Sequence, residues 1–131
     1  MKLLIIGTGS IGERHLRCFQ QLDRCNAIAF CETHARRRAE IAERYGIPET
    51  LAFPDLDSAL ASGSFDAAVI ATPAPTHIPI SIRLAELGIH LLIEKPLSLN
   101  TEGIDILVRI IGEKSLTVAV GYVHRAHPAV E

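Results

Sequence analysis

The chain has 131 residues, of which 48% are hydrophobic and 21% are charged, and its formal net charge is −2. This balance is typical of a globular domain and offers no basic stripe for a nucleic-acid backbone. Its apolar runs are strand-sized, shorter than the roughly twenty residues of a membrane span. We therefore expect one domain that binds neither nucleic acid nor membrane.

The cysteines and histidines do not form the pattern of a metal site. Cys31 and His34 have C-x-x-H spacing, and His124 and His127 have H-x-x-H spacing, but neither pair has a second pair beside it. A structural zinc site needs four ligands, so we assign no metal. The three cysteines include no C-x-x-C pair, and no cleavable signal segment precedes the first strand, which favours a reducing cytoplasm.

The first element is an apolar strand that ends in a glycine turn. Leu3 to Ile6 lack polar alternation, as in parallel strands that are covered on both faces. The spacing Gly7, Gly9, Gly12 predicts a tight turn, a close backbone approach to a ligand and close packing of the next helix. A helix start offers free N–H groups to phosphates, so the stretch predicts a pyrophosphate site.

Strands and helices alternate along the rest of the chain. We expect helices over residues 11–22, 34–45, 54–60 and 76–87, and another that begins near residue 101. We expect the other strands over residues 26–31, 47–53, 65–72, 89–93 and 116–121. The pattern predicts an α/β fold with a doubly wound, mainly parallel, six-stranded sheet and helices on both faces.

Three details of the helices are also predicted. Thr33 is expected to cap the second helix, and Asn100 or Thr101 the last one. The first helix is expected to be amphipathic. Its inward residues would be Ile11, His15, Leu16, Cys18, Phe19 and Leu22.

The stretches that look functional in this sequence come directly after the predicted strands. In a doubly wound sheet the ligand crevice lies outside the carboxyl ends of the strands. The stretches that follow strands there are 7–12, Glu32, 72–77, 94–96 and 122–125. Their coincidence on one edge predicts a ligand site.

Glu32 is the candidate for the ribose end of a dinucleotide. It lies twenty residues after Gly12, where a carboxylate can accept hydrogen bonds from the adenosine ribose hydroxyls. The same carboxylate would repel a ribose 2′-phosphate, which favours NAD over NADP. One of Arg36, Arg37 and Arg38 could still reach a phosphate. The alternative is an exposed acid that caps the next helix.

Lys95 is the candidate catalytic residue. It lies between Glu94 and Pro96 at the end of a strand, so its ammonium could hydrogen-bond a substrate hydroxyl that loses its proton as hydride leaves the carbon. The alternative is a surface lysine paired with Glu94, a contact of little energetic value.

The stretches GTGSIGERH, ATPAPTH and GIHLLIEKP, in this order, closely resemble the amino-terminal domain of the glucose-fructose oxidoreductase, inositol dehydrogenase and rhizopine-catabolism (Gfo/Idh/MocA) family. The resemblance covers essentially the whole chain and implies a Rossmann fold that binds NAD or NADP. It places Lys95 beside nicotinamide and substrate, and His77 at the nicotinamide half of the cofactor. His15 and His77 are interpreted as histidines packed near the cofactor at helix starts, and the alternative is that they act as acids or bases. Motifs and resemblance together indicate these cofactor-binding residues: Gly7, Gly9, Ser10, Ile11, Gly12, Glu32, Arg36, Thr72, Pro73, His77, Glu94, Lys95 and Pro96.

The closing stretch GYVHRAHPAV resembles the family pattern GYNxRFxPA, with Val123 in place of Asn and Ala126 in place of Phe. Tyr122 and Arg125 are candidate substrate contacts together with Lys95, although Arg125 could instead pair with a second domain. His127 and Pro128 have the pattern of a helix start, so we expect a longer protein.

Family members continue into an α/β domain that forms the other pocket wall, carries a catalytic His and mediates oligomerisation. The expected function is therefore the cofactor domain of a dehydrogenase that acts on a secondary alcohol of a sugar, cyclitol or related polyol, a homo-oligomer when full length. The domain alone is expected to bind cofactor without turnover. The alternatives are a nicotinamide-nucleotide sensor or scaffold, which needs no Lys95, and an imine reductase or NAD-using glycosidase.

Overall fold

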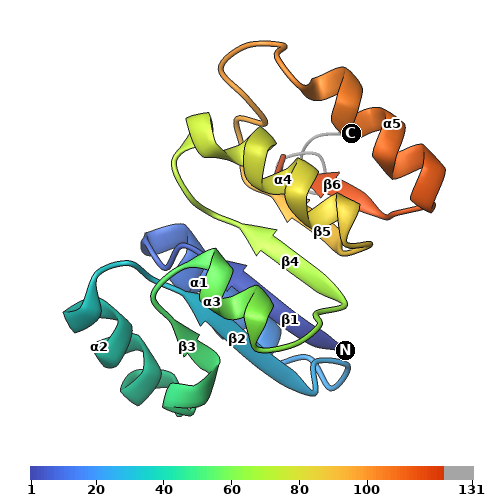
Figure 1. Cartoon of the computed structure of the whole chain (residues 1–131). Coiled ribbons are helices and arrows are strands. Elements are labelled where there is room, and N and C mark those ends of the chain that lie inside the picture. Colours follow the sequence, from blue (N-terminus) through green and yellow to red (C-terminus); the bar gives the residue numbers. More distant parts are fainter. Residues whose placement is uncertain (123–131) are drawn as a thin grey trace, which may run out of the picture.

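The computed structural model describes residues 1–122 and contains one six-stranded sheet, in which the strands follow the order β3-β2-β1-β4-β5-β6 and all pairs are parallel (Figure 1). The strands are β1 (Lys2–Ile6), β2 (Ala27–Cys31), β3 (Ala52–Phe53), β4 (Ala67–Ile70), β5 (His90–Ile93) and β6 (Val118–Val120). The α-helices are α1 (Ser10–Gln20), α2 (Ala35–Tyr45), α3 (Leu56–Ala61), α4 (His77–Glu86) and α5 (Ile104–Lys114). The predicted doubly wound sheet is confirmed.

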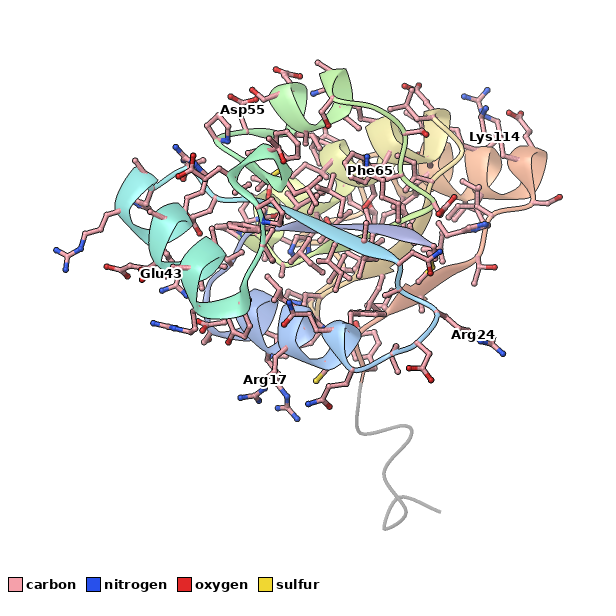
Figure 2. All side chains as sticks on the ribbon, turned by 90° about the horizontal axis from the view of Figure 1, so that it is seen from below. Arg17, Arg24, Glu43, Asp55, Phe65 and Lys114 are labelled. Carbon is pink, nitrogen blue, oxygen red and sulfur yellow. The ribbon has the colours of Figure 1, made fainter. Side chains whose placement is uncertain are left out.

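The helices cover both faces of the sheet because alternate residues of each strand point to opposite sides. Leu3 and Ile5 of β1 pack with Leu16 of α1, whereas Leu4 and Ile6 belong to the core beneath α3, α4 and α5. Figure 2 shows α1 and α2 on one side of the sheet and the other three helices opposite them. No helix within residues 1–122 has both the length and the apolar character needed to cross a membrane.

Backbone hydrogen bonds join the carboxyl ends of all six strands into one continuous edge. Each bond runs from the residue just after one strand to a carbonyl near the end of its neighbour. They are Glu32 N to Phe53 O (3.0 Å), Gly7 N to Cys31 O (3.0 Å), Ala71 N to Ile6 O (2.9 Å), Glu94 N to Ile70 O (2.9 Å) and Gly121 N to Ile93 O (2.8 Å). Residues that follow the strands are therefore held at fixed positions along this edge.

The third strand and the helix caps differ from the prediction. Residues Glu49–Leu51 form a 3-10 turn, η1, closed by a 2.8 Å bond from Leu51 N to Pro48 O, so only two residues are left for β3. Gly103, with a positive φ of 76°, precedes α5, while the side chain of Asn100 accepts a bond from Glu102 N in the turn before it. The predicted caps at Asn100 and Thr101 are wrong because this turn ends before the helix begins.

The first two helices also correct the prediction. α1 ends at Gln20, so Leu22 lies beyond it and is 50% exposed, and both Ile11 and Cys18 face solvent. Leu16 is fully buried as expected. Thr33 does not cap α2, because the N-cap residue is His34, whose N–H donates to the carboxylate of Glu32.

Candidate cofactor site

Two glycines hold the turn after β1 tightly against its neighbours. Gly7 has φ +84°, and a Cβ at this position would lie 2.9 Å from the carbonyl oxygen of Ala71 after β4. A Cβ on Gly12 would lie 1.9 Å from the carbonyl oxygen of Gly7, which no side chain can occupy. The turn therefore requires glycine at both positions, and it brings α1 close to the junction of β1 and β4. This junction is where the strand order reverses, the place where such sheets bind ligands.

Gly9 differs from these two glycines, since a Cβ there would meet no atom within 4 Å. The backbone at Gly9 therefore faces open space. Ser10 and Ile11 follow it at the exposed start of α1, and within residues 1–122 no acceptor is bonded to their N–H groups. Free N–H groups and the positive end of the helix dipole suit an anionic group. The arrangement fits the pyrophosphate of a dinucleotide.

The side chain of Glu32 is anchored within the chain at the end of β2. Its Oε2 accepts a 2.6 Å hydrogen bond from the hydroxyl of Thr8, and its Oε1 accepts a 3.0 Å bond from the N–H of His34. Burial alone would raise the pKa of this carboxyl, but the bonds from Thr8 and His34 and the charge of Arg37 together hold it below its usual range. Glu32 is thus an ionised group at the ribose end of the predicted site. It is buried and not the exposed helix cap of the alternative, since the N-cap residue of α2 is His34 and the carboxylate only accepts the N–H of that residue.

The structure brings Arg37 to this end of the site, and not Arg36. The Arg36 side chain is 93% exposed and pairs with Glu40 along the outer face of α2. Arg37 Nε donates to the carbonyl of Thr8 at 2.7 Å and lies 3.8 Å from Glu32 Oε2. Arg38 also reaches this end, where its Nη1 donates to the carbonyl of Glu32 at 2.7 Å. The arginine run in the sequence allowed any of three residues, and the rotation of α2 brings Arg37 and Arg38 here and leaves Arg36 outside.

Glu13 has a role at this site that the sequence motifs did not indicate. On α1 its carboxylate accepts hydrogen bonds from Arg37 (3.1 Å), Arg44 (2.5 Å) and Tyr45 (2.8 Å), all from α2. Burial raises the pKa of this carboxyl, but the bonds from Tyr45 and Arg44 outweigh that effect and lower it. This cluster ties α2 to α1 and fixes the guanidinium of Arg37. Its members are spread over 32 positions of the chain, so no local motif indicates it.

His77 connects two loops at the other end of the site. It is 1% exposed, and its ring nitrogens lie 2.7 Å from the carbonyl oxygen of Thr72 and 2.9 Å from that of Pro96. Pro73 is exposed between them, and residues Ala74–Thr76 form the short 3-10 turn η2. His77 thus has the packed position considered for it, and it holds the loop after β4 against the loop after β5.

Glu94 and Lys95 at the end of β5 point in different directions. Glu94 is buried, and its Oε1 lies 2.6 Å from Nε2 of His15 on α1. Lys95 is exposed, and within the described residues its ammonium has no carboxylate within 4.0 Å. The surface pair with Glu94, which was the alternative for Lys95, is absent from this part of the chain. The sequence motifs contained both His15 and Glu94 but did not indicate their contact.

Tyr122 follows β6 on the same edge of the sheet, 55% exposed. Arg125 lies outside the described residues, as do His127 and Pro128. The candidate substrate contact at Tyr122 therefore has an accessible side chain, and the one at Arg125 stays a prediction.

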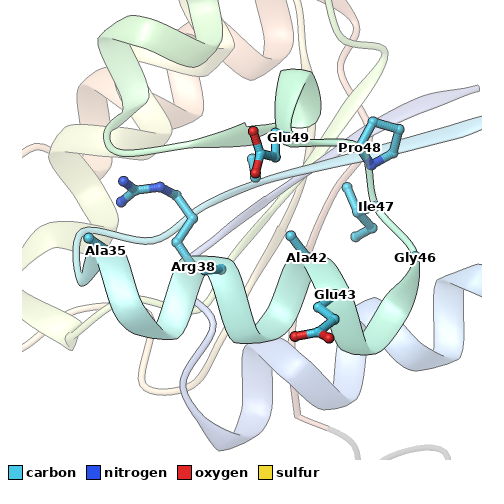
Figure 3. Close-up of a pocket in the computed structure, with 10 residues that line it drawn as sticks. Ala35, Arg38, Ala42, Glu43, Gly46, Ile47, Pro48 and Glu49 are labelled. Carbon is cyan, nitrogen blue, oxygen red and sulfur yellow. The ribbon is translucent and has the colours of Figure 1, made fainter.

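A pocket of about 830 Å³ lies between α2 and the segment that leads into β3 (Figure 3). Its lining includes Arg38, Ala42, Glu43 and Ile47. Arg38 also donates to the carbonyl of Glu32, so the pocket adjoins the end of β2.

Comparison with known proteins agrees with this fold. The family model described as "Oxidoreductase family, NAD-binding Rossmann fold" (Gfo/Idh/MocA) matches residues 1–122. UDP-N-acetylglucosamine 3-dehydrogenase from Acidithiobacillus ferrooxidans is 34% identical over 131 residues, which are 100% of this chain and 40% of that protein. Its solved structure has a TM-score of 0.85, with 99% of this chain and 39% of that chain covered.

Two other relatives extend the comparison. Inositol 2-dehydrogenase from Corynebacterium glutamicum is 30% identical over 132 residues, with 98% of this chain and 38% of that protein covered. The WlbA dehydrogenase from Bordetella pertussis, solved with NADH and UDP-GlcNAcA, is 26% identical and has a TM-score of 0.86 over 99% of this chain and 40% of that chain. The chain thus spans about 40% of the length of the relatives it matches. It belongs to the Gfo/Idh/MocA oxidoreductase family, of which it is an NAD-binding Rossmann domain.

Proposed function

We propose that this chain is the cofactor domain of a dehydrogenase that transfers a hydride between NAD and a secondary alcohol of a sugar, cyclitol or related polyol. The observation that carries the proposal is that the open glycine turn at Gly9, the ionised Glu32 and the exposed Lys95 share one edge of the sheet. The relatives support the substrate class, since by their names they are dehydrogenases of a nucleotide sugar and of inositol.

The N–H groups of Ser10 and Ile11 would hold the pyrophosphate, and Glu32 would accept the ribose hydroxyls. Each oxygen of Glu32 already accepts one bond within the chain. A carboxylate has about four acceptor positions, so room for the ribose hydroxyls is left. Arg37 is already engaged by Thr8 and Glu13. Arg38 likewise donates to the carbonyl of Glu32 at 2.7 Å. A 2′-phosphate would therefore meet the charge of Glu32 beside arginines that already have partners within the chain, and we expect NAD to bind more tightly than NADP.

Lys95 would act on the substrate oxygen. NAD would accept the hydride, and the ammonium of Lys95 would donate a hydrogen bond to the hydroxyl oxygen as its proton passes to a base, which we expect the second domain to supply. A nearby ammonium stabilises the charge that develops on this oxygen, and electrostatic stabilisation of this kind contributes strongly to enzyme catalysis.

The test uses the full-length protein and three measurements: NADH and NADPH titrations, and turnover on sugars, cyclitols and nucleotide sugars. Lys95→Met should lower kcat by about 100-fold or more while the Kd for NADH stays within about threefold. Lys114→Met, at the exposed end of α5 (Figure 2), is the matched control and should leave both unchanged.

The possible outcomes separate the competing functions. Wild-type turnover retained by Lys95→Met would remove Lys95 from catalysis. NADH binding without turnover on any alcohol would favour a sensor or scaffold. An absence of NADH binding would overturn the proposal as a whole, and tighter binding of NADPH would overturn the role given to Glu32.

A further inference from the structure

We propose that His15 and Glu94 are positioning residues for Lys95. The imidazole of His15 holds the Glu94 carboxylate, and that carboxylate holds the backbone N–H of Lys95. The inference deepens the proposed function and rests on it, since it concerns how the candidate catalytic lysine is oriented.

The contacts form a chain of two hydrogen bonds across the edge of the sheet. His15 Nε2 lies 2.6 Å from Glu94 Oε1, and Glu94 Oε2 accepts the N–H of Lys95 at 3.1 Å. The tautomer of His15 that carries its proton on Nε2 donates to this carboxylate oxygen. His15 and Glu94 are 79 positions apart in the sequence, and the contact joins α1 directly to the end of β5.

The carboxylate occupies a space shaped for it. Glu94 is 6% exposed, and a Cβ on Gly121 would lie only 3.1 Å from its Oε1 and 3.2 Å from its Cδ. Gly121 is held there by its 2.8 Å bond to Ile93 O. On the other side, Phe19 packs against the imidazole of His15, with ring centroids 6.4 Å apart. Gly121, just after β6, thus limits the space around the Glu94 side chain, and each of its carboxylate oxygens has a hydrogen-bond partner.

This arrangement matters for Lys95 because a buried carboxylate without partners is costly, so the pair with His15 keeps Glu94 in one orientation. Within the described residues the ammonium of Lys95 has no carboxylate partner. The fold therefore holds Lys95 through its backbone N–H, which donates to Glu94. α1 also begins at the predicted pyrophosphate site. His15 therefore places the cofactor helix and the catalytic lysine in one rigid frame, where a displacement of 1 Å can cost about 100-fold in rate.

The experiment compares three variants of the full-length protein. His15→Leu removes the donor, whereas His15→Gln keeps one, because its amide nitrogen extends about as far from the backbone as the imidazole Nε2. His90→Leu is the matched control: His90 lies at the opposite end of β5, where its Nδ1 accepts the N–H of Thr117.

His15→Leu should lower kcat by about 10- to 100-fold while the Kd for NADH changes by less than about threefold. His15→Gln should keep kcat within about threefold of wild type, and His90→Leu should leave it unchanged. Amide hydrogen exchange gives a second measurement that needs no substrate. The N–H of Lys95 should exchange faster in His15→Leu than in wild type, and His15→Gln should restore its protection.

The inference is overturned if His15→Leu has the kcat and Lys95 exchange of wild type. It is also overturned if His15→Gln fails as His15→Leu does, with NADH affinity and thermal stability lost in parallel, because the role would then be structural only. If the wild type neither binds NADH nor turns over an alcohol, the proposed function fails, whereas the exchange data still decide whether His15 orders Lys95.

Discussion

Glu32 has a role in the fold that is independent of any cofactor. Its carboxylate accepts the hydroxyl of Thr8, which is fully buried in the turn after β1, and the N–H of His34 at the start of α2. These bonds join the turn after β1 and the residue just before α2 to the end of β2. The residue that defines the ribose end of the candidate site therefore also stabilises the fold there. A loss of NADH affinity in Glu32→Ala could then come either from the missing ribose contact or from the disturbed fold.

A pH dependence of stability follows from Glu32. Its pKa in the folded chain is below the unfolded value of about 4.3. The unfolded chain then takes up the proton first as pH falls, so the stabilisation is fully present above about pH 4.3 and is lost as pH falls through the lower folded pKa. Urea unfolding of Glu32→Gln should therefore show a smaller loss of unfolding free energy between neutral and acidic pH than wild type.

Glu40→Gln is the control for this measurement, since its pair with Arg36 lies on the exposed face of α2, where ion pairs contribute little. It should keep the wild-type pH dependence. Parallel curves for Glu32→Gln and wild type would show that the contacts of Glu32 do not stabilise the fold. The pKa of Glu13 is also lowered, so Glu13 adds a loss of unfolding free energy at acidic pH. This loss is the same in wild type, Glu32→Gln and Glu40→Gln.

At the scale of elements, α1 connects the separate parts of the candidate site. Its start faces the predicted pyrophosphate, Glu13 ties it to α2 and His15 ties it to β5. The single buried leucine Leu16 anchors it to the sheet between these contacts. Since the helix is fixed at several points, its N–H groups are preorganised for an anion.

The two glycines at the start of α1 give a prediction that separates binding from folding. Gly9→Ala should keep the wild-type melting temperature, because its Cβ meets no atom within 4 Å, yet weaken NADH binding by about tenfold or more, because that space is where the pyrophosphate would approach. Gly12→Ala should destabilise the fold by about 3 kcal/mol or more, because its Cβ would overlap the Gly7 carbonyl. Thermal unfolding and NADH titration check both.

Wild-type NADH affinity in Gly9→Ala would place the pyrophosphate away from this turn. A normal melting temperature in Gly12→Ala would contradict the close packing of α1 on the turn. Each variant adds one methyl group to the wild-type protein, so each is the control for the other.

At the scale of the whole molecule, the chain spans about 40% of its relatives. Its strand ends offer groups for a cofactor along one edge of the sheet, but a dehydrogenase must also hold its substrate within contact distance of the hydride acceptor. We expect the second wall of the pocket, and assembly into a homo-oligomer, to come from the remainder of the full-length protein.

We therefore predict that the 131-residue chain alone binds NADH within about tenfold of the full-length affinity and oxidises no sugar or cyclitol at a measurable rate. NADH fluorescence measures the binding, and the appearance of NADH absorbance measures turnover. The full-length protein assayed in parallel is the control. Turnover by the chain alone at the rate of the full-length protein would show that the pocket is complete within these residues.

Much of the architecture could be predicted from sequence because its signals are local. The apolar strands, the alternation with helices and the glycine spacing after Ile6 led to the observed sheet, and Gly7 and Gly12 have the geometry that the spacing required. The ends of elements were less predictable, as at β3 and α5, because turns that a few hydrogen bonds stabilise compete there with the regular structure.

By itself the sequence determined the fold class, the edge of the sheet where we expect a ligand, and the identity of Glu32 and Lys95 as its candidate residues. Only the tertiary structure decided that Arg37 rather than Arg36 faces the ribose end, and that His15 contacts Glu94. The physical reason is that each of these contacts depends on the rotation of a helix against a strand or helix distant in sequence. That rotation is set by packing over the whole core, whereas a motif records only neighbours along the chain.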